Sequence, residues 1–222
     1  MYKRQDYAYV EAVEYRRVEK RTSALGAADP RLEVEETWRG SCANVHARGR
    51  VKMTQNRLGV QTHYAYAATS EHGALYTVTA ETKIAGGLVN GKSTREVRFV
   101  SSDGNTTRSE KYALDEAGTW RLTAAADFEY DAQNRETKRT RGNGRVSSRE
   151  MMCCGVLWEI DEDGVRTDYV YDTAQRLTEK TRALTATTPE RARIFTRDAA
   201  GRVTREVPVS YTHLTLPTIC SV

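Results

Sequence analysis

The sequence predicts an all-β protein: a repetitive antiparallel β-hairpin ribbon in which short strands are joined by tight turns. Three observations predict it. A short motif recurs along the chain, polar and β-branched residues alternate within the expected strands, and turn-forming residues follow each strand. The composition of 12 Tyr, only 3 Phe, 15 Gly and only 4 Pro is also typical of a polar, turn-rich β structure.

The recurring motif reads Tyr-Asp-x-x-(Gly/Asn/Gln)-Arg-(Leu/Val)-Thr. Its clearest copies carry their aspartate at Asp131 and Asp172, and a third copy has Asp198 after an arginine. The first two aspartates are 41 residues apart, which corresponds to two units of about 20 residues. Repeats of this length predict short units that are stable only when each packs against its neighbours.

A second pattern precedes the motif. The segment from Gly164 to Tyr171 is echoed, 105 residues earlier, by the segment from Gly59 to Tyr66. Thr, Tyr and Tyr stand at every second position in both, whereas the residues between them differ. Because successive side chains of a strand point to opposite faces, the pattern predicts a strand with one face preserved and the other free to vary.

Turn chemistry follows from the same residues. The aspartate after the tyrosine is expected to accept a backbone N–H two residues further on and so form an Asx-turn, with Gly or Asn near the tip tolerating a positive φ. The segments Asp161-Glu162-Asp163-Gly164 and Ser102-Asp103-Gly104-Asn105 contain Asp-Gly, which predicts primed two-residue hairpin turns.

The two ends are expected to carry no folding information. Codons that fit Tyr2-Lys3-Arg4-Gln5 are the reverse complement of codons that fit Val209-Ser210-Tyr211, and both resemble the mosaic end of a transposase-based sequencing adapter. We therefore expect sequencing scars at 1–5 and 209–222. Between them we expect a degenerate β region at 6–50, degenerate repeats at 51–127 and clear repeats at 128–208.

Charge and hydropathy limit the partners. The chain has 34 basic and 30 acidic residues, a net charge of +4, so its surface is mixed and we predict no nucleic-acid partner. The basic segment from Lys138 to Arg145 is interpreted as a solvated hairpin tip. No apolar run approaches the length of a membrane span, so none is predicted.

No motif for catalysis or metal binding stands out. Cys153 and Cys154 are adjacent, which suits neither a zinc site nor a redox pair, and we predict a buried strand there that leads to Trp158. The segment from Gly86 to Ser93 ends in Gly-Lys-Ser, but we expect a hairpin turn because a phosphate loop needs a strand before it and a helix after it. The sequence thus predicts no enzyme, no catalytic residue, no cofactor and no metal. An enzymatic alternative would require reactive thiols at Cys153 and Cys154.

The motif residues resemble the tyrosine-aspartate (YD) repeat of the Rhs family, which is related to insecticidal toxin-complex shells and to teneurins. The match is clear from Phe128 to Glu206 and degenerate back to about Val51, and it departs from the pattern at Gln175 and Glu136. The residues that define the repeat are Tyr130, Asp131, Arg135, Gly164, Thr167, Tyr169, Tyr171, Asp172, Arg176, Leu177, Asp198, Gly201 and Arg202.

The resemblance implies a curved shell or β-sheet spiral in a large secreted or surface bacterial protein. It implies as partners the remainder of the same polypeptide and an enclosed C-terminal toxin domain that this chain does not contain. The expected function is therefore structural, the enclosing or presenting of that effector. The alternative is a carbohydrate- or cell-surface-binding adhesion module whose exposed Tyr and Arg side chains contact glycans.

Overall fold

The structure is a computed structural model that describes residues 3–24, 31–84, 86–153, 155–182 and 190–211. These residues form sixteen β-strands and one 3-10 turn, η1 (Glu71–Gly73). They divide into two compact units, Met1–Asp127 and Phe128–Val222. Within each unit every strand pairs antiparallel with the next in the chain, so the predicted all-β hairpin ribbon is confirmed. No helix among the described residues is long and apolar enough to cross a membrane.

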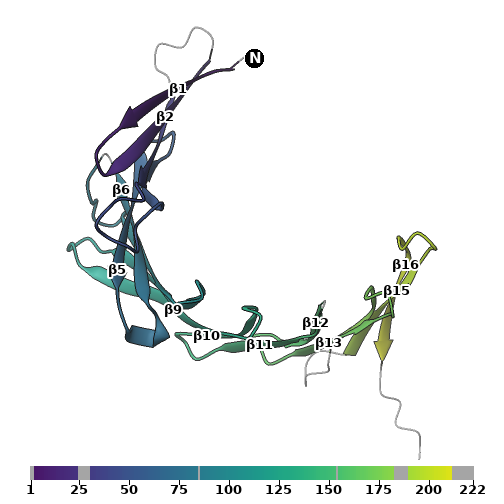
Figure 1. Cartoon of the computed structure of the whole chain (residues 1–222). Coiled ribbons are helices and arrows are strands. Elements are labelled where there is room, and N and C mark those ends of the chain that lie inside the picture. The colour runs from purple at the N-terminus through teal and green to yellow at the C-terminus, as the bar shows by residue number, and fades with distance from the viewer. Residues whose placement is uncertain (1–2, 25–30, 85, 154, 183–189, 212–222) are drawn as a thin grey trace, which may run out of the picture. The chain divides into compact units, whose positions relative to one another are not determined.

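The strands of the first unit lie side by side in chain order (Figure 1). They are β1 (Lys3–Glu11), β2 (Tyr15–Ala24), β3 (Arg31–Trp38), β4 (Val51–Gln55), β5 (Val60–Ala68), β6 (Tyr76–Ile84), β7 (Thr94–Val100), β8 (Thr106–Leu114) and β9 (Trp120–Tyr130), the last of which ends inside the second unit. Within the region at 6–50, in which only degenerate β structure is expected, the described residues form β1, β2 and β3, and a loop follows from Arg39 to Arg50. The domain boundaries and adapter-like ends stay predictions, and residues 1–2 and 212–222 lie outside the described residues.

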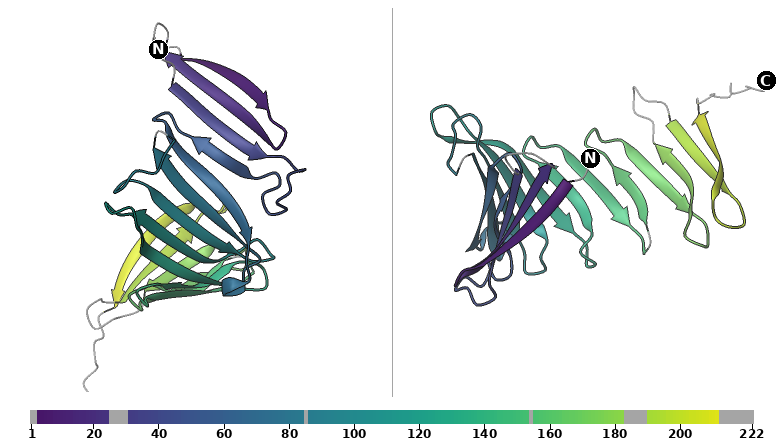
Figure 2. Two further views of the ribbon diagram at one scale, coloured as in Figure 1. Left: turned by 90° about the vertical axis from the view of Figure 1, so that its left-hand side faces the viewer. Right: turned by 90° about the horizontal axis from the view of Figure 1, so that it is seen from above.

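The second unit contains the remaining strands, of which β10 to β14 are short and β15 and β16 are longer (Figure 2). They are β10 (Glu136–Arg141), β11 (Val146–Met151), β12 (Val156–Ile160), β13 (Arg166–Tyr171), β14 (Leu177–Arg182), β15 (Glu190–Arg197) and β16 (Val203–Tyr211). An antiparallel sheet in chain order places every second turn at the same edge. The turns after β9, β11, β13 and β15 therefore share one edge, and those after β10 and β12 share the other.

Little of this structure is deeply buried. The core cluster of the first unit consists of Tyr76, Val78 and Val100, with Tyr64 and Tyr66 packed against it. Cross-strand neighbours explain the cluster, because Tyr76 lies opposite Val100, and Tyr66 lies opposite Val78. A single layer of strands gives most side chains only half-burial, so each hairpin depends on the hairpins beside it for stability.

The predicted primed two-residue turns are wrong. The N–H of Gly164 donates to the carbonyl of Asp161 (2.9 Å), and the N–H of Asp161 donates to that of Val165 (3.0 Å). Gly164 has a φ of +79° but Asp163 has no positive φ, whereas a type I′ turn needs two such residues in succession. The loop is thus a type I turn followed by one left-handed residue. The side chain of Asp161 favours this form because it accepts the N–H of Val165 as well.

The predicted buried strand at Cys153 is also wrong. Strand β11 ends at Met151 and β12 begins at Val156, so Cys153 lies in the intervening turn and is exposed. Cys154 lies outside the described residues. The chain must reverse here, and Gly155 faces the hydroxyl of Tyr171 so closely that an added Cβ would lie 2.6 Å from the hydroxyl oxygen.

The hairpin turn expected between Gly86 and Ser93 is confirmed, since β6 and β7 flank it as antiparallel neighbours. Four residues separate Gly86 from Gly91, which is the full spacing of a phosphate loop, so only the structural context argues against one. Strand β7 follows in place of a helix. The hydroxyl of Ser93 is buried and accepts the N–H of Val89 at 2.9 Å.

Gln175 provides a test of the turn geometry, because it occupies the left-handed position of its turn with a φ of +62°. A residue with a Cβ is strained there, so Gln175→Gly is expected to raise the free energy of unfolding by about 0.5–1 kcal/mol. Urea unfolding followed by far-UV circular dichroism measures the change. Asn134→Gly, at a φ of +60°, is the matched control and should gain less because Asn tolerates this region. A loss of stability in Gln175→Gly would contradict the assignment.

Candidate functional site: the aspartate–arginine turns

The motif residues come together in the turns at one edge of the second unit. In the first of them, Oδ1 of Asp131 accepts the backbone N–H groups of Gln133 and Arg135, both at 2.9 Å. Oδ2 of the same carboxylate accepts the Nε–H of Arg135 at 2.7 Å. One carboxylate therefore satisfies two backbone donors inside the turn and pairs with a guanidinium that follows it.

The other two copies repeat this arrangement. Asp172 accepts the N–H groups of Ala174 and Arg176 at 2.9 Å and pairs with Nε of Arg176 at 2.7 Å. Asp198 accepts the N–H of Arg202 at 2.9 Å and its Nε–H at 2.8 Å. These bonds confirm the predicted Asx-turn at Asp131 and Asp172. They also give the motif arginine a role that the sequence did not reveal, as the second partner of the carboxylate.

The same bonds set the charge state of the turns. The pKa of Asp172 is below the ordinary value of an aspartate, mainly because its carboxylate accepts the backbone N–H of Arg176. The guanidinium of Arg176 lowers the pKa further, whereas partial desolvation raises it. The pKa of Asp131 and of Asp198 is lowered by the equivalent N–H and guanidinium of Arg135 and Arg202. All three carboxylates are thus stabilised in their ionised form.

Arginines also join successive turns along this edge. Nη1 of Arg135 donates to the carbonyl of Met152, in the next turn of the edge, at 2.6 Å. Arg197, which stands where other copies have Tyr, donates to the carbonyl of Leu177 at 3.2 Å and to that of Gly201 at 3.0 Å. Each hairpin is therefore tied to the one beside it through side chains as well as through the strand ladder.

The motif threonine occupies a β-bulge. Tyr171 lies opposite Leu177 and Val170 lies opposite Glu179, so Thr178 is one extra residue on β14. A bulge disrupts the ladder locally, and the Thr178 hydroxyl donates to the carbonyl of Val170 at 3.1 Å. Equivalent hydroxyl-to-carbonyl bonds join Thr137 to Glu129 (3.2 Å), Thr204 to Thr196 (3.1 Å) and, in the first unit, Thr107 to Phe99 (3.3 Å).

The alternating face of the second pattern is observed on β13. Thr167 is buried and shares its face with the half-buried Tyr169 and Tyr171. The hydroxyl of Tyr171 donates to the carbonyl of Val156 at 3.0 Å, and that of Tyr66 donates to Val51 at 2.8 Å. The echo between the two segments thus corresponds to the same contact geometry in both units.

Two further tyrosines of the repeat lie in half-buried positions. Burial, and then a hydrogen bond from its hydroxyl to the carboxylate of Glu159, raise the pKa of Tyr169. Burial also raises the pKa of Tyr130, which ends β9 directly before its turn. Both phenols therefore stay neutral and serve as hydrogen-bonding and packing groups.

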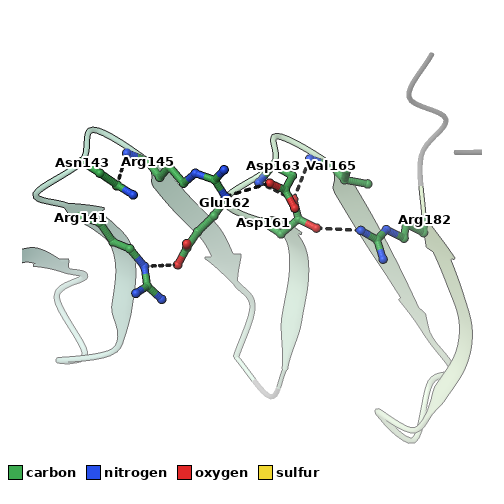
Figure 3. Close-up of polar contacts among 8 residues, drawn as sticks. All are labelled: Arg141, Asn143, Arg145, Asp161, Glu162, Asp163, Val165 and Arg182. Atoms are coloured by element: carbon green, nitrogen blue, oxygen red, sulfur yellow. Dashed lines mark hydrogen bonds and ion pairs between the residues drawn. The ribbon is translucent and has the colours of Figure 1, made fainter. Parts of the chain in front are cut away.

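The opposite edge carries a ladder of charges between neighbouring turns (Figure 3). Arg141 and Arg145 flank the turn after β10, and they pair with Glu162 and with Asp163 (3.1 Å), respectively, in the turn after β12. The segment from Lys138 to Arg145 is thus a hairpin tip, as predicted, but the guanidinium groups of its turn are paired with acidic partners.

We use the term turn lock for the bonds that a turn aspartate makes to the backbone N–H groups of its turn and to an arginine. The turn at Asp161 has no motif arginine, and its aspartate binds an arginine of another strand (Figure 3). Its Oδ1 accepts the N–H groups of Asp163 and Val165 at 3.0 and 2.9 Å. Oδ2 accepts a guanidinium N–H of Arg182, at the end of β14, at 2.9 Å. Because exposed ion pairs contribute little on their own, the carboxylate-to-backbone bonds are the larger part of each lock.

The turn residues are arranged to hold the chain itself. In every copy the carboxylate, the guanidinium and the hydroxyl bind groups of the same or the adjacent hairpin. Among the described residues, no group of three or more His, Cys, Asp and Glu side chains is placed to hold a metal ion. The bonds of these residues hold each turn closed and connect it to the hairpin beside it.

Comparisons with known proteins give one kind of match. No family model and no curated protein sequence matches the chain. Twenty-six chains of solved structures match, among them one from "Crystal Structure of TcdB2-TccC3-Cdc42", with 11% identity and a TM-score of 0.31 over 91% of this chain. The matched segment spans only 15% of that chain.

Substitutions at Asp172 separate the two roles of the turn carboxylate. Asp172→Asn keeps an oxygen that can accept the backbone N–H groups but loses the charge, whereas Asp172→Ala loses both. The urea midpoint is expected to fall in the order wild type, Asn variant, Ala variant. Asp103→Ala is the control, since Asp103 is exposed and its side chain has no partner among the described residues. An Asn variant as unstable as the Ala variant would show that the backbone bonds contribute nothing.

The lowered aspartate pKa values predict a loss of stability in acid. A carboxylate whose pKa is lower in the folded state contributes its stability above the unfolded pKa and loses it as the pH falls through the folded pKa. We expect constant urea midpoints from pH 7 to about 5 and a decline below about pH 4, near the ordinary aspartate pKa. Replacing Asp131, Asp172 and Asp198 together by Asn should make this decline shallower, and an unchanged or steeper decline would contradict the cause given for it.

Proposed function

We propose that this chain is a structural segment of a larger bacterial protein of the Rhs type, whose β-repeat ribbon encloses or presents a C-terminal effector domain. The observation that supports the proposal is the recurrence of one turn at Asp131, Asp172 and Asp198, in which the aspartate, the arginine and a threonine hydroxyl bound to a strand carbonyl have the same roles. These are the residues through which the sequence resembles the tyrosine-aspartate repeat.

The physical argument concerns how such a ribbon grows. Each turn satisfies its own backbone donors, and arginines bind carbonyls of neighbouring hairpins, as Arg135 does at Met152 and Arg197 at Leu177. A unit that contacts only its neighbours can be repeated many times without changing any contact. A single-layer sheet built this way offers two faces over a large area, which suits a wall or a display surface.

Several finer points belong to the proposal. We propose that the segment acts by shape, without catalysis of its own, and that its partners are the rest of the same polypeptide and the effector domain. We propose a secreted or surface location for the whole protein. The alternative of carbohydrate or cell-surface binding stays a prediction of the sequence.

The proposal is tested on the complete polypeptide from which the chain comes. The flanking coding sequence is expected to encode further repeats and a downstream domain, and limited proteolysis of the purified protein should leave that domain intact. Replacing Asp131, Asp172 and Asp198 together by Ala should expose the domain to cleavage, because the hairpins that cover it lose their turn locks.

Asp103→Ala is the control for that experiment and should leave the protection unchanged. A parent protein without a downstream domain, or a domain that is cleaved equally fast in wild type and triple variant, would contradict enclosure.

A further inference from the structure

The loop between β3 and β4 departs from the repeat. The aspartate–arginine turns close within five residues, as Asp131 to Arg135 does, whereas this loop runs from Arg39 to Arg50. It is nonetheless well bonded to the sheet. The amide of Asn44 donates to the carbonyl of Tyr66 at 2.7 Å, and the ring of His46 stacks on that of Tyr76 with 5.1 Å between their centres. Ordered loops on a regular scaffold are where binding sites concentrate.

The loop, the end of β3 and strand β5 line an open pocket of about 340 Å³. Three aromatic side chains line it, Trp38, Tyr64 and Tyr66, together with small residues of the loop and of β5. The volume is at the lower end of the range for small-molecule sites. The lining residues are Glu14, Trp38, Cys42, Ala43, Asn44, Ala47, Tyr64, Ala65 and Tyr66.

Most polar groups of this lining are already bound within the chain. Oδ1 of Asn44 accepts the N–H of His46 at 3.0 Å, and its amide group is bound to Tyr66. The hydroxyl of Tyr66 donates to Val51, and the thiol of Cys42 donates to the carbonyl of Asn44. A ligand that needs many hydrogen bonds, such as a sugar, would find few free partners here.

Glu14 is the one charged residue among the described residues that line the pocket. Its side chain is exposed and has no partner in the part of the chain that the structure describes. None of the nearby cations pairs with Glu14: Arg39 pairs with Glu11, Lys52 pairs with Glu36 at 3.0 Å, and Arg50 lies against the rings of Tyr66 and Tyr76. The carboxylate of Glu14 is therefore free to receive a positive charge from outside the chain.

The aromatic cluster already attracts cations. The guanidinium of Arg50 lies 4.5 Å from the ring centre of Tyr76 and 5.6 Å from that of Tyr66. The ammonium of Lys52 lies 5.3 Å from the ring centre of Trp38. These distances are those of cation–π contacts, in which the negative face of a ring attracts a positive group.

We propose that this pocket binds an organic cation with a fully methylated ammonium group, such as a choline head group or a trimethylated lysine side chain. The rings of Trp38, Tyr64 and Tyr66 contact the methyl groups, and Glu14 balances the charge. Such a cation has no N–H to donate, which suits a lining with few free acceptors. The inference rests on the first unit alone and stands independently of the proposed function.

The test is a calorimetric titration of the full chain with choline and with 3,3-dimethylbutan-1-ol, its uncharged isostere. Choline is expected to bind at least about tenfold more tightly, because the isostere keeps the shape but loses the charge. Trimethyllysine forms a third arm, and its affinity relative to choline distinguishes a side chain from a head group as the natural source. Equal binding of choline and its isostere, or no binding of any methylated ammonium, overturns the proposal.

Variants assign the binding to this pocket. Trp38→Ala and Glu14→Gln should each weaken choline binding several-fold, while Trp38→Phe, which keeps an aromatic ring, should retain part of it. Glu71→Gln is the matched control, because it removes an exposed carboxylate of η1 outside the pocket. Far-UV circular dichroism checks that each variant folds, and Glu14→Gln decides the matter if Trp38→Ala does not. Unchanged affinity in Glu14→Gln and Trp38→Phe with lowered affinity in Glu71→Gln would place the binding elsewhere.

Discussion

The second unit depends on one interaction, the carboxylate at the head of a turn shared between backbone N–H groups and a guanidinium. A tight turn leaves donors that no strand partner can reach, and an exposed hairpin has little apolar burial to offset them. The aspartate satisfies these donors locally and pairs with the arginine after it, and in the first copy that arginine, Arg135, also binds the carbonyl of Met152 in the next hairpin. Where the arginine is absent, as at Asp161, a neighbouring strand supplies Arg182 instead.

The threonine at the β-bulge stabilises the same end of the hairpin as the turn aspartate. Closing a turn with one left-handed residue shifts the register of the flanking strands, and the extra residue falls on Thr178 and Thr204. Their hydroxyl groups bind carbonyls across the bulge. The motif therefore combines three side chains that act on consecutive parts of a single hairpin end, which explains why they recur together at constant spacing.

The strands and the Asx-turns could be predicted because they depend on local spacing. Alternation of residue types predicts which side chains of β13 share a face. An aspartate two residues before an unpaired backbone N–H predicts the hydrogen bond between them. The partners of the arginines could not be predicted, since they depend on which turns share an edge. The turn type at Asp161 was mispredicted because Asp-Gly fits two loop geometries, and only the side-chain bond to Val165 selects between them.

The aromatic pocket gave no signal in the sequence. Its walls come from the end of β3, the long loop and β5, so Trp38 and Tyr64 meet only because the loop folds back over the sheet. The sequence does offer one hint, because the segment between Trp38 and Val51 is longer than a turn of the repeat. Strand alternation predicts that Tyr64 and Tyr66 share a face, but it does not predict what covers them.

Native-state hydrogen exchange of the turn amides tests the central claim most directly. If each carboxylate holds its turn closed, the N–H groups of Arg135, Arg176 and Arg202 exchange slowly and at similar rates, because each donates to an aspartate oxygen. The amides of Ala132, Thr173 and Ala199, which directly follow the three aspartates, should exchange much faster. Arginine amides that exchange as fast as those three amides would contradict the account.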